Sequence, residues 1–167
     1  MSDDLSPRLA LPLLNAGQAQ KEITHNEALT LLDLLTQAVV VAVGVNVPPE
    51  GPVPGQCWIV GPAPEGAWSG YAQALAGWSD SGWRFCLPVP GMCVWSLADG
   101  AQLRFEDDRW SIGMVRAAGL DVGGMQVVGA RQSAVAEPTG GTVIDVEART
   151  AIAGVLAALH THGLIGA

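Results

Sequence analysis

The sequence predicts an α+β fold with a capped N-terminal helix, a small tryptophan-rich antiparallel β-meander, short strands and a C-terminal helix. Three observations predict it. A leucine-rich segment near the N-terminus repeats its apolar residues at helical spacing. The middle of the chain alternates apolar with polar residues between turn signals, and an alanine-rich segment with an apolar stripe follows. With 167 residues, the chain is long enough to bury a proper core.

The N-terminal helix is predicted from its capping residues. Pro7 and Pro12 block an earlier start. Thr24 and Glu27 have the spacing of a capping box, in which the Thr24 hydroxyl accepts the Glu27 backbone N–H and the Glu27 carboxylate reaches back to Thr24. The apolar face that follows is predicted to be Ala28, Leu31, Leu32 and Leu35. Residues 13–23 before the helix are polar and have no core to join, so we expect an arm there.

The strands are predicted from β-branched runs and from alternation. Residues 37–43 (QAVVVAV) indicate a strand buried on both faces that ends at Gly44. Residues 56–112 predict the meander. Its turn signals lie at residues 79–82, 99–100 and 107–108. Side chains expected to share a strand face are Trp83, Phe85 and Leu87, then Cys93, Trp95 and Leu97, then Leu103 and Phe105.

The chain is expected to have two parts. Residues 1–112 hold the arm, the first helix and the Trp-rich β domain. Residues 113–167 are rich in Gly, Ala and Val before their helix, and we expect them to form an assembly module. Short strands are predicted within residues 125–130 and 131–137.

The last helix is predicted over residues 146–161, with Asp145 as its N-cap. Its apolar stripe is Ala148, Ile152, Val155, Leu156 and Leu159. A helix of this length is marginal alone in water, so it must dock on something. Gly154 in mid-helix suggests close approach by a neighbour, which is either the same subunit or a symmetry mate.

Composition excludes several classes of partner. The net charge of −8 disfavours nucleic acid and anionic membranes, because neither supplies the cations that an acidic surface needs. No run reaches the roughly 18 apolar residues of a membrane span. The three cysteines, Cys57, Cys86 and Cys93, form no CxxC pair. Buried free thiols in a reducing compartment are therefore the simplest interpretation.

Catalytic motifs are absent or weak, so we expect no enzymatic activity, no metal and no cofactor. The sequence has no nucleophile elbow, no phosphate-binding glycine loop and no HExxH motif. Glu106, Asp107 and Asp108 could ligate a cation, but adjacent acids at a hairpin tip are usually just solvated. These three acids also lie too close together on one turn to serve as the two separated carboxylates that a polymer hydrolase needs on either side of the bond it cleaves.

The six tryptophans are the sharpest chemical feature. Core packing is the expected role of Trp58, Trp83, Trp95 and Trp110, because a small meander needs large residues to fill its interior. Trp68, Tyr71 and Trp78 lie among Gly, Ser and Ala outside strong alternation. They are therefore the candidate glycan-stacking residues, since aromatic faces on β-scaffolds stack sugar rings.

Residues 11–29, LPLLNAGQAQKEITHNEAL, resemble the opening signature of a family of uncharacterised function found in tailed phages, prophages and gene transfer agents of alphaproteobacteria. The resemblance covers nearly the whole chain. Its further segments are residues 66–70 (GAWSG), 82–85 (GWRF), 109–110 (RW), 140–141 (GG), 145–149 (DVEAR), 151–152 (AI) and 159–165.

The resemblance implies a virion structural protein, specifically the head-spike or tail-spike base or adaptor of a phage-like particle. Such a protein is assembled in the bacterial cytoplasm and lies on the mature particle surface, where it anchors a host-binding fibre. Its partners would be further copies of itself, capsid or tail proteins and the fibre. The candidate assembly residues are Gln18, Gln20, Lys21, Ile152, Val155, Leu156 and Leu159. The alternative is a carbohydrate-binding module that contacts host polysaccharide through Trp68, Tyr71 and Trp78.

Overall fold

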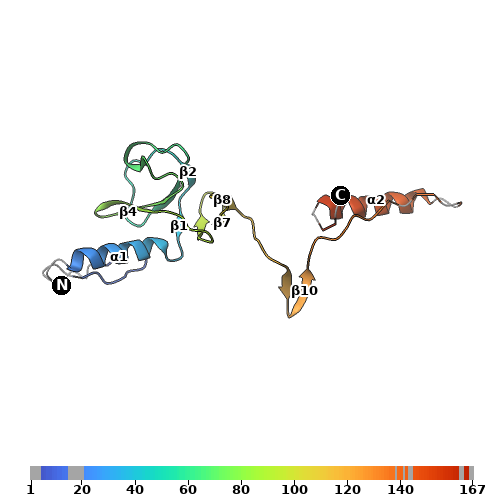
Figure 1. The fold of residues 1–167 in the computed structure, drawn as a ribbon, viewed down its shortest axis with the longest axis horizontal. Coiled ribbons are helices and arrows are strands. Elements are labelled where there is room, and N and C mark those ends of the chain that lie inside the picture. Colours follow the sequence, from blue (N-terminus) through green and yellow to red (C-terminus); the bar gives the residue numbers. More distant parts are fainter. Residues whose placement is uncertain are drawn as a thin grey trace. The chain divides into compact units, whose positions relative to one another are not determined.

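The computed structural model describes residues 5–14, 21–137, 139, 140, 142, 145–161, 164 and 165. In chain order, one helix precedes the strands and another follows them, and most of the strand pairs are antiparallel. This confirms the expected α+β class (Figure 1). The contacts divide the chain into two compact units, Met1–Met114 and Val115–Ala167. Each unit is described by itself below.

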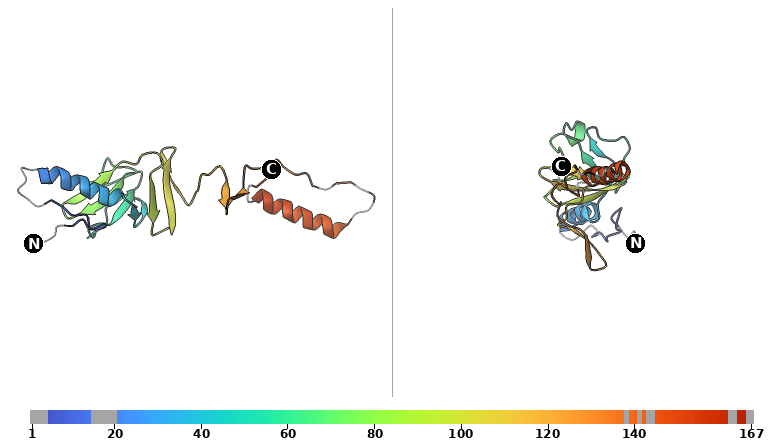
Figure 2. Two further views of the ribbon diagram at one scale, coloured as in Figure 1. Left: turned by 90° about the horizontal axis from the view of Figure 1, so that it is seen from below. Right: turned by 90° about the vertical axis from the view of Figure 1, so that its right-hand side faces the viewer.

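Unit 1 combines one helix, α1 (Lys21–Leu35), with two four-stranded sheets. The first sheet has the order β2-β3-β4-β5 and the second β1-β6-β7-β8. In each sheet the first strand lies parallel to its neighbour and the other three form an antiparallel meander. Figure 2 shows α1 running alongside these sheets. The strands are β1 (Val39–Val40), β2 (Val43–Val45), β3 (Cys57–Val60), β4 (Leu75–Ser79), β5 (Gly82–Cys86), β6 (Cys93–Ser96), β7 (Ala101–Glu106) and β8 (Arg109–Ile112).

The single strand expected over residues 37–43 is wrong, because this segment passes from one sheet to the other. The Ala38 carbonyl accepts the N–H of Trp95 in the second sheet at 2.9 Å, whereas the Val41 N–H donates to Cys57 in the first at 2.7 Å. The segment therefore forms two short strands, β1 and β2, and joins both sheets.

Two apolar cores lie in unit 1. The larger contains α1 and strands of both sheets, and its buried members are Leu34, Ala38, Val40, Cys57, Ile59, Leu75, Val94 and Leu103. The second is aromatic, and its buried members are Trp58, Val60, Trp68 and Ala76. Adjacent residues of β3 and β4 alternate between the two cores, so both faces of the first sheet are covered.

The start and the buried face of α1 both differ from the prediction. The helix begins at Lys21, so Thr24 lies inside it and is exposed rather than capping. Leu34 is buried, whereas Leu32 and Leu35 are exposed. The reason is the close approach of β4, because a Cβ on Gly77 would lie 2.5 Å from Leu34 Cδ1. Because Gly77 has no side chain, there is room for Leu34 to pack against β4.

The N-terminal segment is docked on α1 where the structure describes it. The Asn26 amide binds both backbone polar groups of Leu14, donating to its oxygen at 2.9 Å and accepting from its nitrogen at 2.8 Å. The Arg8 guanidinium donates to the helix-end carbonyls of Leu34 and Gln37. Residues 5–14 are therefore part of the folded unit. The candidate assembly residues Gln18 and Gln20 lie outside the described residues, and Lys21 is the first residue of α1.

The antiparallel strands predicted over residues 56–112 are present, but they belong to two sheets rather than to one meander, and the phase expected for β6 is wrong. Val94 and Ser96 are buried, while Cys93, Trp95 and Leu97 are exposed. At the end of β6, the buried Ser96 hydroxyl donates to Asp99 Oδ2 at 2.5 Å, and this bond holds the Ser96 side chain on the inner face of the strand. Leu103 and Phe105 of β7, which were predicted to share a face, are both buried.

Unit 2 contains a hairpin and a helix. Strands β9 (Leu120–Val122) and β10 (Met125–Val128) are antiparallel, and helix α2 spans Val146–Thr161. The predicted N-cap is confirmed, because Asp145 Oδ1 accepts the Ala148 N–H at 2.8 Å. Instead of a second strand within residues 131–137, a single parallel bridge joins Gln132 to Ile165.

Candidate functional site

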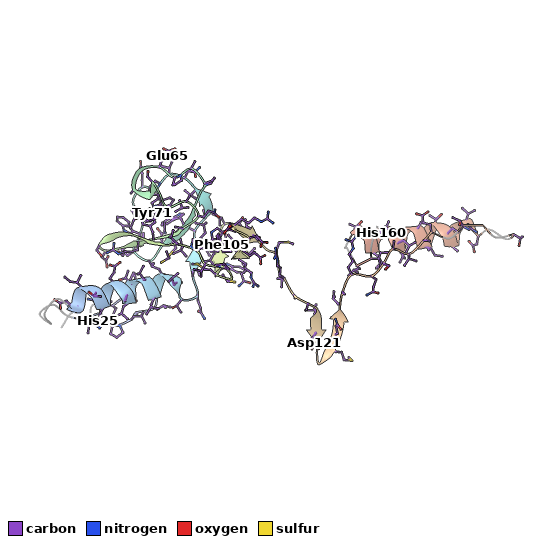
Figure 3. All side chains as sticks on the ribbon, in the orientation of Figure 1. His25, Glu65, Tyr71, Phe105, Asp121 and His160 are labelled. Carbon is purple, nitrogen blue, oxygen red and sulfur yellow. The ribbon has the colours of Figure 1, made fainter. Side chains whose placement is uncertain are left out.

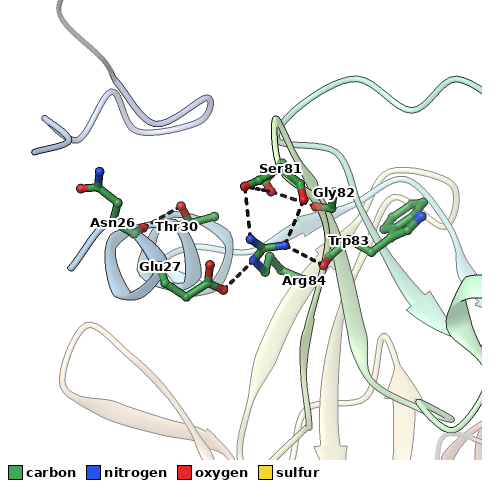
Figure 4. A network of polar contacts seen from close by, with 8 residues as sticks. Asn26, Glu27, Thr30, Ser81, Gly82, Trp83 and Arg84 are labelled. Carbon is green, nitrogen blue, oxygen red and sulfur yellow. Dashed lines mark hydrogen bonds and ion pairs between the residues drawn. The ribbon is translucent and has the colours of Figure 1, made fainter. Parts of the chain in front are cut away.

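A hollow of about 360 Å³ with both polar and apolar walls lies beside α1 and the β4–β5 turn. Arg84 reaches Glu27 with 2.5 Å between Nε and the carboxylate, and its other nitrogens donate to Ser81 Oγ at 3.2 Å and to the Trp83 carbonyl at 3.0 Å (Figure 4). The Glu27 carboxylate thus pairs with Arg84 rather than capping its own helix. The Arg84 guanidinium therefore joins α1 to the β4–β5 hairpin, through an ion pair with Glu27 and hydrogen bonds to Ser81 and Trp83.

The tryptophan cluster forms the aromatic core of the first sheet. Trp83 contacts Trp68 edge-on at a centroid distance of 5.1 Å and Trp58 at 5.6 Å. Trp68 enters this cluster from the short 3₁₀ helix Gly66–Trp68 and is fully buried. The prediction that Trp68 stacks a glycan is therefore wrong, because no face of its ring reaches the solvent.

Tyr71 and Trp78 occupy separate aromatic contacts. Tyr71, labelled in Figure 3, is 39% exposed, but one face of its ring stacks on Phe85 with 3.8 Å between the ring centroids. Trp78 is half-buried and meets Trp83 edge-on at 4.9 Å. The structure thus leaves the three predicted stacking residues without a shared open platform.

Trp95, expected in the core, is instead 46% exposed on the outer face of the second sheet. It lies opposite Gln102 of β7 and beside Val39 of β1. A shallow groove of about 380 Å³ is lined by these three residues together with Gln37, Ala38, Cys93 and Val94. Sequence reasoning missed this position because it assigned the wrong phase to β6. The signal that could have corrected it was the spacing of Ser96, at the end of β6, and Asp99, in the turn that follows.

The acidic turn of the second sheet holds no assembled metal site. Asp107 and Asp108 both have positive φ, 50° and 56°, and form the tight turn between β7 and β8. Glu106 lies 3.6 Å from Arg104 Nε. Among the described residues, no group of three His, Cys, Asp or Glu is placed to hold a metal ion.

The cysteines differ in burial, contrary to the expectation that all three are buried. Cys57 is fully buried, and the loss of solvent raises the pKa of its thiol to about 12. Burial also raises the pKa of Cys86, which is half-buried. Cys93 is exposed beside Trp95 because β6 has the opposite phase.

The candidate assembly residues of α2 divide between two environments. Leu156 is buried within unit 2 and Leu159 is half-buried, whereas Ile152 is 46% and Val155 59% exposed. A Cβ on Gly154 would meet nothing within 4 Å. The close neighbour suggested by this glycine is therefore not supplied by the same subunit in the described structure.

The fold and these sites define an α+β protein of two units. Unit 1 buries a tryptophan-rich core, whereas the hairpin and helix of unit 2 leave apolar side chains exposed. No helix among the described residues is both long and apolar enough to cross a membrane. The chain belongs to the family described as protein of unknown function (DUF2793), whose model matches residues 25–111. That match runs from α1 to β8 and ends before unit 2. The comparison with curated proteins finds no match.

Proposed function

We propose that this protein is a structural component of a phage-like particle, a head-spike or tail-spike base or adaptor that anchors a host-binding fibre. The observation that carries the proposal is the contrast between the two units. Unit 1 has two covered cores, whereas unit 2 exposes apolar side chains on both its hairpin and its helix. A compact domain joined to an incompletely covered one is the organisation expected of an assembly subunit.

The resemblance of residues 11–29 to phage and gene transfer agent proteins supplies the setting for this assembly. The proposed partners are other copies of the chain, capsid or tail proteins and a fibre. The role is structural and requires no catalytic step, metal or cofactor. It places the protein on the particle surface after assembly in the bacterial cytoplasm.

The test is to purify particles from a bacterium that encodes the protein. We expect the protein to band with particles in a density gradient and to be labelled at spikes by gold-conjugated antibody. Deletion of its gene should give particles that lack the spike and its fibre. A protein that stays entirely in the particle-free fraction, or particles unchanged by the deletion, would contradict the proposal.

A second candidate function, glycan binding, is favoured by the exposed Trp95. A half-exposed indole offers a face for a sugar ring, and the amides of Gln37 and Gln102 in the same groove can bind sugar hydroxyls. This site replaces the one predicted at Trp68, Tyr71 and Trp78. Titration with purified host capsular polysaccharide should show binding that Trp95→Ala abolishes and Tyr71→Ala preserves. No binding by the unaltered chain, or equal binding by both variants, would exclude this function.

A further inference from the structure

The hairpin of unit 2 has one face composed entirely of apolar side chains. In its register Leu120 lies opposite Val128, and Val122 opposite Met125. Because strand side chains alternate and cross-strand partners share a face, these four point the same way. Asp121 and Gln126, which are also paired, form the opposite face. We call Leu120, Val122, Met125 and Val128 the hairpin face.

The hairpin face is uncovered within the described structure. Its four side chains are between 41% and 71% exposed. The register shift between Gln126 and Val128 leaves Val127 as an extra residue that is also 56% exposed. Asp121, by contrast, is engaged, since its carboxylate accepts the N–H of Gly124 at 2.9 Å and closes the turn.

Apolar surface continues from the hairpin to helix α2. Val128 also lines a groove of about 520 Å³ whose other walls include Leu159 and Leu164. On α2, Val155 lies one turn before Leu159, and Ile152 one turn before Val155 or Leu156. The exposed helix residues Ile152 and Val155 therefore extend the same apolar surface. We call them the α2 stripe.

Unit 2 buries little apolar surface of its own. Among its described residues, the buried hydrophobic side chains are Leu156 and Ile165. A two-stranded hairpin is marginally stable at best in water, and so is a helix of 16 residues. Unit 2 therefore needs additional apolar contacts to hold both elements.

The charge distribution favours a second copy of the same unit as the source of these contacts. Residues 115–167 contain four Asp or Glu and three Arg, a formal net charge of −1. Residues 1–114 contain twelve Asp or Glu and five Lys or Arg, a net charge of −7. Copies brought together through unit 1 would repel one another, whereas unit 2 approaches its own copy with almost no net repulsion.

We propose that unit 2 is the self-association surface of this protein, in which the hairpin face and the α2 stripe pack on the same surfaces of another copy. A symmetric interface requires a patch complementary to itself, and an apolar patch on a nearly neutral unit meets that requirement. Association then completes the fold of unit 2. The proposal rests on the proposed function and deepens it by locating the surface through which copies of the chain contact one another. Its test does not depend on a particle, because the purified chain either associates or does not.

The test compares two Asp substitutions in α2 of the full chain. Val155→Asp places a charge in the stripe, whereas Ala157→Asp places the same charge on an exposed position at the other side of the helix. In sedimentation velocity from low to high micromolar concentration, we expect the unaltered chain and Ala157→Asp to associate. Val155→Asp should associate at least about tenfold more weakly, because a charge is desolvated in the interface. Val122→Asp and Gln126→Asp provide the same comparison for the hairpin.

Cysteine cross-linking tests the contact without disrupting it. In a Cys93→Ser background, Val155→Cys should form a disulfide-linked dimer under mild oxidation and Ala157→Cys should not. Unaltered chain that is monomeric at every concentration would overturn the proposal, since another protein or the chain's own residues would then cover these faces. Equal association of Val155→Asp and Ala157→Asp, together with equal cross-linking of the two cysteine variants, would also overturn it. Failure of the protein to appear on particles would leave these results unchanged and would count against the proposed function alone.

Discussion

Ser6 donates a hydrogen bond of 2.6 Å from its hydroxyl to Asp33 Oδ1, and both side chains are buried although 27 residues separate them. The same carboxylate accepts the backbone N–H groups of Arg8 at 3.0 Å and Leu9 at 2.6 Å. Asp33 therefore holds the N-terminal segment against the end of α1. A buried carboxylate is tolerated there because three donors surround it.

Replacing Asp33 should release this segment. Asp33→Ala leaves the Ser6 hydroxyl and the Leu9 N–H without their acceptor, so we expect a loss of about 2 kcal/mol or more in the free energy of unfolding. Urea denaturation measures the loss, and limited proteolysis should show earlier cleavage within residues 5–14. Asp80→Ala, which changes an exposed aspartate at the β4–β5 turn, is the control. Equal midpoints for both variants would show that the Asp33 contacts contribute nothing.

Trp68 and Trp95 should differ sharply in their contribution to stability. Trp68→Ala removes a fully buried ring from the aromatic core and is expected to cost about 3–5 kcal/mol. Trp95→Ala removes a half-exposed ring and should change stability by less than about 1 kcal/mol. Thermal or urea unfolding of the two variants, followed by tryptophan fluorescence, measures the difference. Similar losses in both would mean that Trp95 is a core residue after all.

A larger residue in place of Gly77 should destabilise the fold while Leu34 faces it. A Cβ at this position lies 2.5 Å and 2.7 Å from the two Leu34 methyl carbons, so Gly77→Ala is expected to destabilise by about 1–3 kcal/mol. A double-mutant cycle measures the cause. In a Leu34→Ala background the same substitution should cost clearly less, because the methyl enters the space that leucine vacated. Additive losses would show that the clash is not with Leu34.

How far the sequence predicted the fold depended on whether a signal was local. The Asp145 cap and the extent of α2 were predicted correctly because capping and periodicity involve residues a few positions apart. The capping box predicted at Thr24 failed because the helix begins at Lys21, which puts Thr24 inside it. The Glu27 carboxylate pairs instead with Arg84, a partner far away in the sequence that local spacing cannot reveal.

The candidate site was harder to predict than the fold. Alternation along β6 shows that Cys93 and Trp95 share a face but cannot show which face is buried, because both sets contain apolar residues. The wrong phase placed Trp95 in the core, whereas the misassignment of Trp68 to the surface has a separate cause. Trp68 reaches the core through a 3₁₀ turn, where the strand periodicity used for the other tryptophans gives no information.

Cys57 should make the stability of the protein depend on alkaline pH. Its pKa is raised from the usual 9.0 to about 12, so between these values the folded chain keeps a proton that the unfolded chain releases. The stabilisation is complete below pH 9 and should fall as the pH rises toward 12, by at most about 1.4 kcal/mol per pH unit. Urea denaturation across this window measures the slope. Cys57→Ala removes the titrating group, so its slope should be shallower by that amount even though its stability at neutral pH is lower. Parallel slopes for the two proteins would show that the Cys57 thiol does not control this loss.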